Sequence, residues 1–325
     1  MIIKTFLEVL PPMVVLFICI AIGFILRKCR ILPDNANTVM SKLENWVFCP
    51  ALSISTFMTR CTVENISKHY SLVLYCIGAG VIAFFIAIFL AKIFVRQDCY
   101  ERNAYKYALM IGNIGFMGDP VVLGLFGQDM LFLYKLFYLP LTILIYTWGI
   151  SILIPKQKTE GGHDNPLKRL INAPFIALLI GSLLGLTGLG DHMPTIANNV
   201  LSTCAACMSP VAMLLTGFTI GTYSVKRMLT AKKVYVAAIF RLVVIPAVLV
   251  SLLYLVGANE IVLICGFFAF ATPFGLNTVV FPLAYGGDPE TGASMAMISH
   301  TLCIVTIPLL FGLLSSVVDV SGFLI

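Results

Sequence analysis

Two apolar segments, residues 107–122 and 268–282, carry polar side chains together with helix-breaking Gly and Pro residues. The first contains Gly112, Asn113, Gly118, Asp119 and Pro120, and the second contains Pro273, Gly275, Asn277 and Thr278. Proline removes a backbone donor and clashes with the preceding turn, and glycine weakens a helix further. A break at membrane depth survives only where protein or a wet cavity satisfies the freed backbone groups. The paired breaks therefore predict a binding site, and we expect these residues to form it.

Asn113 and Asn277 each sit at a break. A side-chain amide there can contact a substrate carboxylate, or it can merely cap the following half-helix. Thr278 can add a hydroxyl, although threonine also packs comfortably in membrane helices. The lone His300 is interpreted as a packed polar residue.

Asp119 and Arg241 are charged residues within apolar segments, which makes both of them candidates for function. Asp119 can bind Na⁺, exchange a proton or pair with a cation, and we assign it to ion coupling. Arg241 can hold a substrate carboxylate bidentately, form a structural ion pair with Asp119 or Glu44, or extend to the cytoplasmic face. We include Arg241 among the candidate substrate-binding residues.

The composition places these residues in a polytopic membrane protein. The 325-residue chain is 59% hydrophobic and only 11% charged, with a mean hydropathy of +0.99. A soluble domain carries about a quarter charged residues. Apolar runs of roughly 20 residues mark membrane spans, and ten are predicted, at 5–26, 37–58, 70–94, 104–125, 131–154, 171–188, 195–221, 233–256, 260–284 and 292–317.

The distribution of Lys and Arg predicts the topology. Fifteen lie in the connections after spans 1, 3, 5 and 7, whereas the opposite side holds only Lys4, Arg60, Lys68 and Lys135. The positive-inside rule then places both termini outside and the link 156–170 in the cytoplasm. The net charge of +6 is thus a topology signal, and no nucleic-acid partner is expected.

Residues 1–155 and 171–325 repeat the same order of features. Pro50 in span 2 matches Pro210 in span 7, Pro140 in span 5 matches Pro308 in span 10, and the breaks fall in spans 4 and 9. Five spans per half is an odd number, so the second half must be inverted. The predicted fold is an all-α polytopic membrane protein with ten transmembrane helices in a 5+5 inverted repeat, whose two Pro/Gly-broken helices cross. Their half-helix N-termini then meet near mid-membrane and favour an anion.

The motif Asn113-Ile-Gly-Phe-Met-Gly118-Asp-Pro120, with Gly127 beyond it, resembles the fourth-span signature of the auxin efflux carrier family. Pro273-Phe-Gly275 and the residues after it resemble the ninth span, and the similarity covers essentially the whole chain. The resemblance implies a bacterial-type carrier with a mobile bundle, a scaffold and a homodimeric state. Family members are linked to malonate, malate, oxalate or auxin. The chain departs from the plant pattern at Gly112, where the plant carriers have proline, and at Asp119, where they have an apolar residue.

The predicted function is secondary transport of a small organic anion, a mono- or dicarboxylate, across the cell membrane by alternating access. Its expected partners are that anion, membrane lipids and a second copy of the chain. Coupling to Na⁺ or H⁺ stays open, and no cofactor or metal is expected. Motifs of hydrolases, metalloenzymes and nucleotide-binding enzymes are absent from the sequence, so it is not interpreted as an enzyme. Three alternatives remain: a sodium-coupled symporter of the bile-acid symporter type, a channel, and a non-transporting anion sensor.

Overall fold

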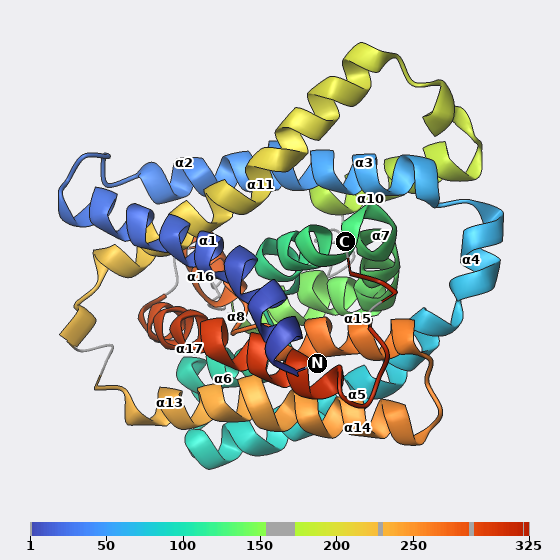
Figure 1. Cartoon of the computed structure of the whole chain (residues 1–325). Helices are drawn as coiled ribbons and strands as arrows, with labels where there is room; N and C mark the ends of the chain where they lie inside the picture. The colour runs from blue at the N-terminus through green and yellow to red at the C-terminus, as the bar shows by residue number, and fades with distance from the viewer. Residues whose placement is uncertain (1, 154–172, 227–229, 286–288, 321, 325) are drawn as a thin grey trace, which may run out of the picture.

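The structure is a computed structural model that describes residues 2–153, 173–226, 230–285, 289–320 and 322–324. Within these ranges every regular element is helical and no β-strand is present. Gly112 and Phe274 form an isolated antiparallel bridge. The helices pack into one bundle, with α1 crossing over α11 on one side and α5, α13 and α14 on the other (Figure 1). The predicted all-α class is confirmed.

The N-terminal half contains long helices interrupted by short π-helical turns, labelled η. The elements are α1 (Ile2–Lys28), α2 (Ala36–Leu43), η1 (Glu44–Phe48), α3 (Cys49–Arg60), α4 (Val63–His69), α5 (Ser71–Phe94), α6 (Tyr100–Met110), η2 (Ile114–Gly118), α7 (Asp119–Leu144), η3 (Ile145–Gly149) and α8 (Ile150–Leu153). Gly127 has φ 76° inside α7, a left-handed conformation that suits glycine. It divides α7 into two arms, so the stretch after the first break turns back on itself.

The C-terminal half also consists of helices interrupted by short turns. Its elements are α10 (Ala173–Leu186), the 3₁₀ turn η4 (Leu189–His192), α11 (Thr195–Thr222), α13 (Lys232–Ile239), η5 (Phe240–Val244), α14 (Ile245–Leu255), α15 (Glu260–Ala271), α16 (Asn277–Tyr285) and α17 (Glu290–Leu314). The predicted link 156–170 lies outside the described residues.

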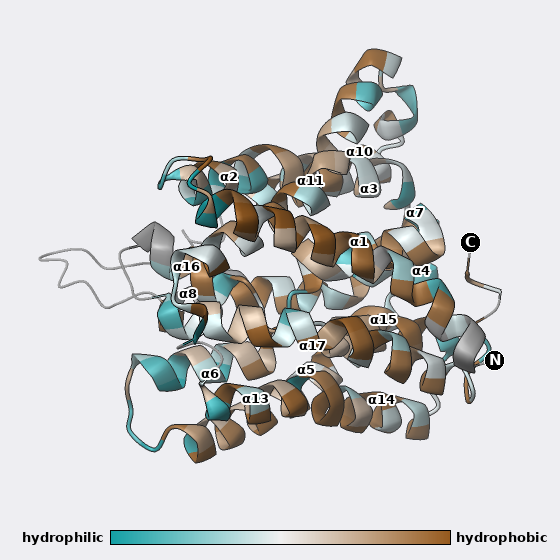
Figure 2. Ribbon diagram, turned by 60° about the vertical axis from the view of Figure 1, so that its left-hand side comes forward, coloured by the Kyte–Doolittle hydropathy of each residue, from teal (hydrophilic) through white to brown (hydrophobic). Residues whose placement is uncertain are grey.

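Several helices have the length and composition of membrane spans. Six such stretches are Leu7–Lys28, Ser71–Phe94, Ile114–Leu153, Thr195–Thr222, Lys232–Leu255 and Glu290–Leu314, and the shorter apolar helices are Ala173–Leu186 and Glu260–Ala271. Phe85 and Phe89 of α5 are each 66% exposed. Exposed aromatic side chains of this kind suit a surface that faces lipid better than one that faces water. Hydrophobic residues run along helices such as α1, α14 and α15 (Figure 2). The protein is a multi-pass membrane protein, while the count of ten spans stays a prediction.

Three of the π-helical turns precede a proline. Pro50, Pro120 and Pro246 each stand at the start of the α-helix that follows η1, η2 and η5. A proline inside a helix lacks the N–H for its i−4 carbonyl and clashes with the preceding turn. A π-turn adds one residue to the turn and accommodates the ring without ending the helix, and such turns frequently occur at functional sites. All three turns lie near the place where the two broken segments meet, which is described below.

α1 and α11 cross with their backbones in contact. A Cβ added at Gly217 of α11 would collide with the Ile20 carbonyl of α1, and one at Gly23 of α1 would collide with the Leu214 carbonyl of α11. Small residues at such crossings let membrane helices approach closely and gain dispersion contacts along their length. Close packing therefore holds α1 against α11, and it requires glycine in both helices.

Gly217→Leu is expected to destabilise the protein by about 1–3 kcal/mol or more, because the larger side chain forces α1 and α11 apart. The midpoint of thermal unfolding in detergent measures this change. Gly78→Leu is the matched control, since Gly78 is exposed on α5 and a Cβ there meets nothing within 4 Å. Equal unfolding midpoints for the two variants would contradict the packing argument.

Candidate functional site

The two breaks lie side by side and bond to each other. The Asn113 N–H donates to the Pro273 carbonyl at 2.8 Å, and the Gly275 N–H donates to the Ile111 carbonyl at 3.2 Å. The intervening Gly112 and Phe274 form the antiparallel bridge. Backbone groups that the breaks free are thus satisfied across the crossing, as a break at membrane depth requires. The two broken segments therefore meet at their breaks, and this meeting point is called the crossing below.

A buried arginine holds the ends of both leading half-helices, α6 and α15. The guanidinium of Arg241 donates from Nη1 to the Leu109 carbonyl of α6 at 3.4 Å, from Nη2 to Ala269 of α15 at 3.3 Å, and from Nε to Thr272 at 3.2 Å. Arg241 is fully buried. Each helix C-terminus carries roughly half a negative charge on its unpaired carbonyls, so one cation stabilises both.

Gly112 allows this arrangement. A Cβ at Gly112 would collide with the Arg241 guanidinium and with the Thr272 hydroxyl. The plant carriers have proline at this position, whereas this chain has Gly112. Glycine is required here because the Arg241 side chain occupies the space beside the first break.

A cavity of about 90 Å³ lies at the crossing, and Arg241 is not among the residues that line it. Its polar side chains are Asn45, Ser53, Asn113, Asp119, Lys135, Tyr138, Thr142 and Asn277, and its apolar ones include Cys49, Phe116, Ile145, Pro174, Phe175, Leu178, Met208 and Leu276. They come from both halves of the chain. The cavity thus combines hydrogen-bonding groups on one part of its wall with an apolar surface on another.

Both trailing half-helices begin at this cavity. Ile114, Gly115 and Phe116 of η2 line it, and so does Asn277, the first residue of α16. The first N–H groups of a helix have no acceptor within the helix, and together they carry roughly half a positive charge. A Cβ at Gly115 would meet nothing within 4 Å, so this turn faces open space. The two helix starts offer backbone donors to a ligand in the cavity.

Neighbouring rings hold the amides of the two asparagines. The Asn113 Nδ2 lies 3.0 Å from His300 Nε2, and His300 Nδ1 lies 2.8 Å from the Ala296 carbonyl. Because a carbonyl only accepts, Nδ1 donates and Nε2 accepts from the Asn113 amide. Asn277 Nδ2 donates to the Tyr107 hydroxyl at 2.8 Å. Asn113 stands at the N-cap position of η2 but makes no side-chain capping bond, so capping alone does not account for it.

Asp119 forms a buried ion pair with Lys135. Its Oδ2 lies 2.6 Å from Lys135 Nζ, and the two side chains are 1% and 6% exposed. Its Oδ1 accepts from the Tyr138 hydroxyl at 2.8 Å, and Lys135 Nζ lies 3.4 Å from that hydroxyl. Asp119 and Lys135 stand on the two arms of α7 that Gly127 separates. The left-handed turn therefore brings the opposite charges together.

The ion pair corrects two sequence-based interpretations. The sequence pattern places Lys135 among the outer topology charges, yet Lys135 is buried and lines the cavity. The sequence allows an ion pair between Asp119 and Arg241, but in the described part of the chain the ion-pair partner of Asp119 is Lys135. Lys135 lies within the apolar stretch Leu131–Leu141. A cation in such a stretch is a functional candidate by the rule that was applied to Asp119 and Arg241, and that signal could have found it.

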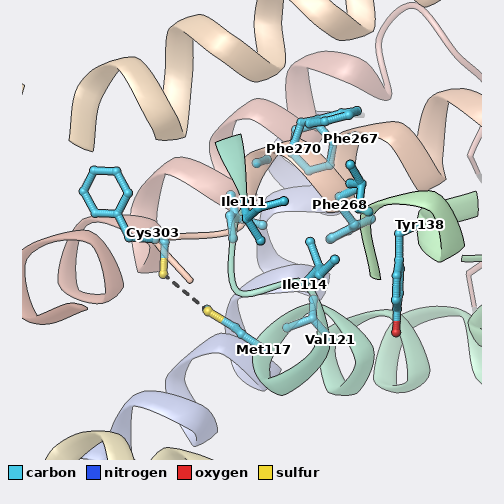
Figure 3. Close-up of a cluster of buried hydrophobic side chains, with 14 of the residues drawn as sticks. Ile111, Ile114, Met117, Val121, Tyr138, Phe267, Phe268, Phe270 and Cys303 are labelled. Carbon is cyan, nitrogen blue, oxygen red and sulfur yellow. Dashed lines mark hydrogen bonds between the residues drawn. The ribbon is translucent and has the colours of Figure 1, made fainter. Parts of the chain in front are cut away.

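The structure divides the other predicted site residues into two groups. The residues that line the cavity are Gly112, Asn113, Asp119, Gly275 and Asn277. The residues that do not line it are Gly118, Pro120, Pro273, Thr278 and Arg241. The Tyr134 side chain packs against Gly118, and Tyr138 directs its hydroxyl away from Phe267 and Phe270 (Figure 3). The Thr278 hydroxyl donates to the Gly275 carbonyl at 2.9 Å. A role in substrate binding stays a prediction for every one of them.

A family model described as "Membrane transport protein" matches residues 8–311. The chain belongs to this family, the auxin efflux carriers. The transporter is 23% identical over 295 residues to an "Uncharacterized transporter" of Methanothermobacter thermautotrophicus, covering 90% of this chain and 94% of that protein. It is 22% identical over 304 residues to an "Uncharacterized transporter" of Methanocaldococcus jannaschii, covering 91% and 95%. The resemblance drawn from the two broken motifs is confirmed at the level of the family.

Arg241→Lys is expected to destabilise the transporter, because a compact ammonium cannot reach three carbonyls that a planar guanidinium fork serves. Each buried carbonyl left unpaired costs about 1–3 kcal/mol. The thermal unfolding midpoint in detergent checks this, with Arg96→Lys as the control at an exposed position. Unfolding of Arg241→Lys at the wild-type temperature would refute the role of Arg241 at the crossing.

Proposed function

We propose that the transporter moves a small organic anion, a mono- or dicarboxylate, across the cell membrane by alternating access. The observation that carries this proposal is the convergence of two half-helix starts and one buried ammonium, that of Lys135, on a single cavity. Helix N-termini attract anions through unpaired N–H groups and the helix dipole. An ammonium adds a full positive charge that a carboxylate can approach.

Arg241 supports the proposal of an anion site although it does not line the cavity. It neutralises the negative ends of the leading half-helices, so the cavity is exposed mainly to the positive ends of the trailing ones. The substrate-binding groups that we assign are therefore backbone donors of η2 and α16, the amides of Asn113 and Asn277, and Lys135. Gly112 and Gly275 shape the crossing, and Arg241 supports it.

The walls of the cavity suit a small acid with a short carbon skeleton. Phe116, Phe175, Leu178 and Met208 supply the apolar part, against which methylene or aromatic carbons gain about 25 cal/mol per Å² of buried surface. The volume of about 90 Å³ favours small acids in this conformation. Oxalate, malonate, malate and an auxin-like acid form the panel of candidate substrates.

Alternating access would use the ten helices as two inverted repeats of five, at residues 1–155 and 171–325. Figure 2 shows both chain ends at the same end of the molecule, as an even number of crossings requires. The bias of Lys and Arg toward the opposite connections supports an outside position for that end. The proposal includes a mobile bundle that works against a scaffold, and a homodimer in the lipid membrane.

Purified transporter in liposomes is expected to take up at least one of these labelled acids in a saturable manner, and Asn113→Ala is expected to weaken that uptake. Losing a hydrogen bond to a charged group costs about 1.5–3 kcal/mol. That loss corresponds to a rise of about tenfold or more in the half-saturating concentration.

Asn199→Ala is the control, because Asn199 is exposed on α11 away from the cavity. Both variants are compared at matched amounts of folded, reconstituted protein. Wild-type liposomes that take up none of the four acids above protein-free liposomes would overturn the proposed substrate class.

A further inference from the structure

Asp119 and Lys135 are the charged side chains of the cavity in the described part of the chain, and they cancel one another. The positive group that suits a carboxylate is thus already paired with a carboxylate of the protein. A substrate anion has to compete with Asp119 for the ammonium. The resting cavity therefore contains an internal substitute for its ligand.

Simple addition of an anion to this pair is unfavourable. Two carboxylates would share one ammonium among side chains that are 1% and 6% exposed, where the effective dielectric constant is low. An uncompensated buried charge costs several kcal/mol. A cation must accompany the anion to restore neutrality, and the surroundings of Asp119 decide which cation fits.

The groups around Asp119 are donors. Its Oδ1 accepts from the Tyr138 hydroxyl and its Oδ2 contacts the Lys135 ammonium. A sodium ion needs several oxygen ligands that direct lone pairs at it, and an ammonium beside it would repel it. No group of three or more His, Cys, Asp or Glu side chains that could hold a metal ion is present among the described residues. A proton needs only one oxygen of the carboxylate.

We propose that the substrate carboxylate and one proton bind together, the proton to Asp119 and the carboxylate to Lys135. In this exchange the ion pair between Asp119 and Lys135 breaks, a neutral Asp119 carboxyl forms, and a new ion pair joins Lys135 to the substrate. The proton comes from the same water that supplies the substrate, so charge and atoms balance. The inference rests on the proposed function and assigns its coupling ion. Transport then becomes proton–carboxylate symport, neutral overall for a monoanion.

Other ionisable groups surround the pair and define what a test must separate. Those that face it or its immediate neighbours are Tyr134 and Tyr138 of α7, Cys49 of α3, Glu44 of η1, Cys76 of α5, Cys265 of α15, Arg241 of η5 and, beside Asn113, His300 of α17. Among these groups, Tyr138 is the one that hydrogen-bonds to the Asp119 carboxylate in the described part of the chain. Glu44 is buried but does not line the cavity, so it serves as the control carboxyl.

The test measures binding and proton uptake together, on purified protein in detergent with oxalate, malonate, malate and indole-3-acetate as probes. In a weakly buffered solution with a pH indicator, the wild type is expected to take up about one proton per bound anion. Its dissociation constant should rise by up to about tenfold per pH unit at high pH, as linkage to one proton requires. Asp119→Asn should bind the same probe with no proton uptake from the protein and no such pH dependence. This variant also provides the baseline for protons that the probe itself exchanges.

Two further variants separate coupling from a structural effect. Lys135→Gln should lose most of the binding at every pH, because the substrate has lost its cation. Glu44→Gln should keep the proton uptake of the wild type. The wild-type measurement stands by itself if Asp119→Asn fails to fold.

The outcomes for the two proposals are distinct. Anion binding by the wild type without proton uptake would overturn the coupling inference and leave the carboxylate carrier intact. Proton uptake that persists in Asp119→Asn would also overturn the assignment to Asp119. Stimulation of binding by Na⁺ at constant pH would replace the proton by sodium. A wild type that binds none of the four acids would overturn the proposed function and this inference with it.

Discussion

The Arg241 guanidinium is buried where α6 and α15 end, and its three hydrogen bonds reach the carbonyls of both half-helices. Without it, two partly negative helix ends would face one another in a medium that offers no water to satisfy them. With it, the breaks can lie close enough for Asn113 to bond to Pro273 and Gly275 to Ile111. The crossing, and hence the cavity beyond it, depends on this cation.

The prolines shape the same region by another route. The π-turns η1, η2 and η5 each precede a proline. Each of these turns contributes a polar side chain or backbone groups near the crossing. η1 precedes Cys49 and contains Asn45, η2 lines the cavity, and η5 carries Arg241. A turn widened by one residue changes the direction of the side chains that follow it. The prolines thus set which residues point inward, while the helices continue.

The charges are separated into two compartments. Arg241 contacts the negative ends of the leading half-helices, whereas the Asp119–Lys135 pair lines the cavity together with the positive ends of the trailing ones. The second compartment is balanced only as long as its ion pair is intact. In the proposed function, binding of an anion disturbs this neutral state, which links the electrostatics of the resting site to the proposed coupling ion. The family supports transport, and this charge balance supplies a physical reason for the coupling that we propose.

The sequence by itself determined the membrane environment, the all-α class, the family and the position of both breaks, because these depend on local composition and on residues close together in the chain. Asn113, Asp119 and Asn277 could be placed at the site on the same basis. The tertiary structure alone decided the partners. Arg241 lies 31 positions before Thr272 and 132 after Leu109, and no local pattern reveals which carbonyls it reaches. Lys135 meets Asp119 because Gly127 reverses the chain between them, and that left-handed turn made an apparent surface charge into a buried one.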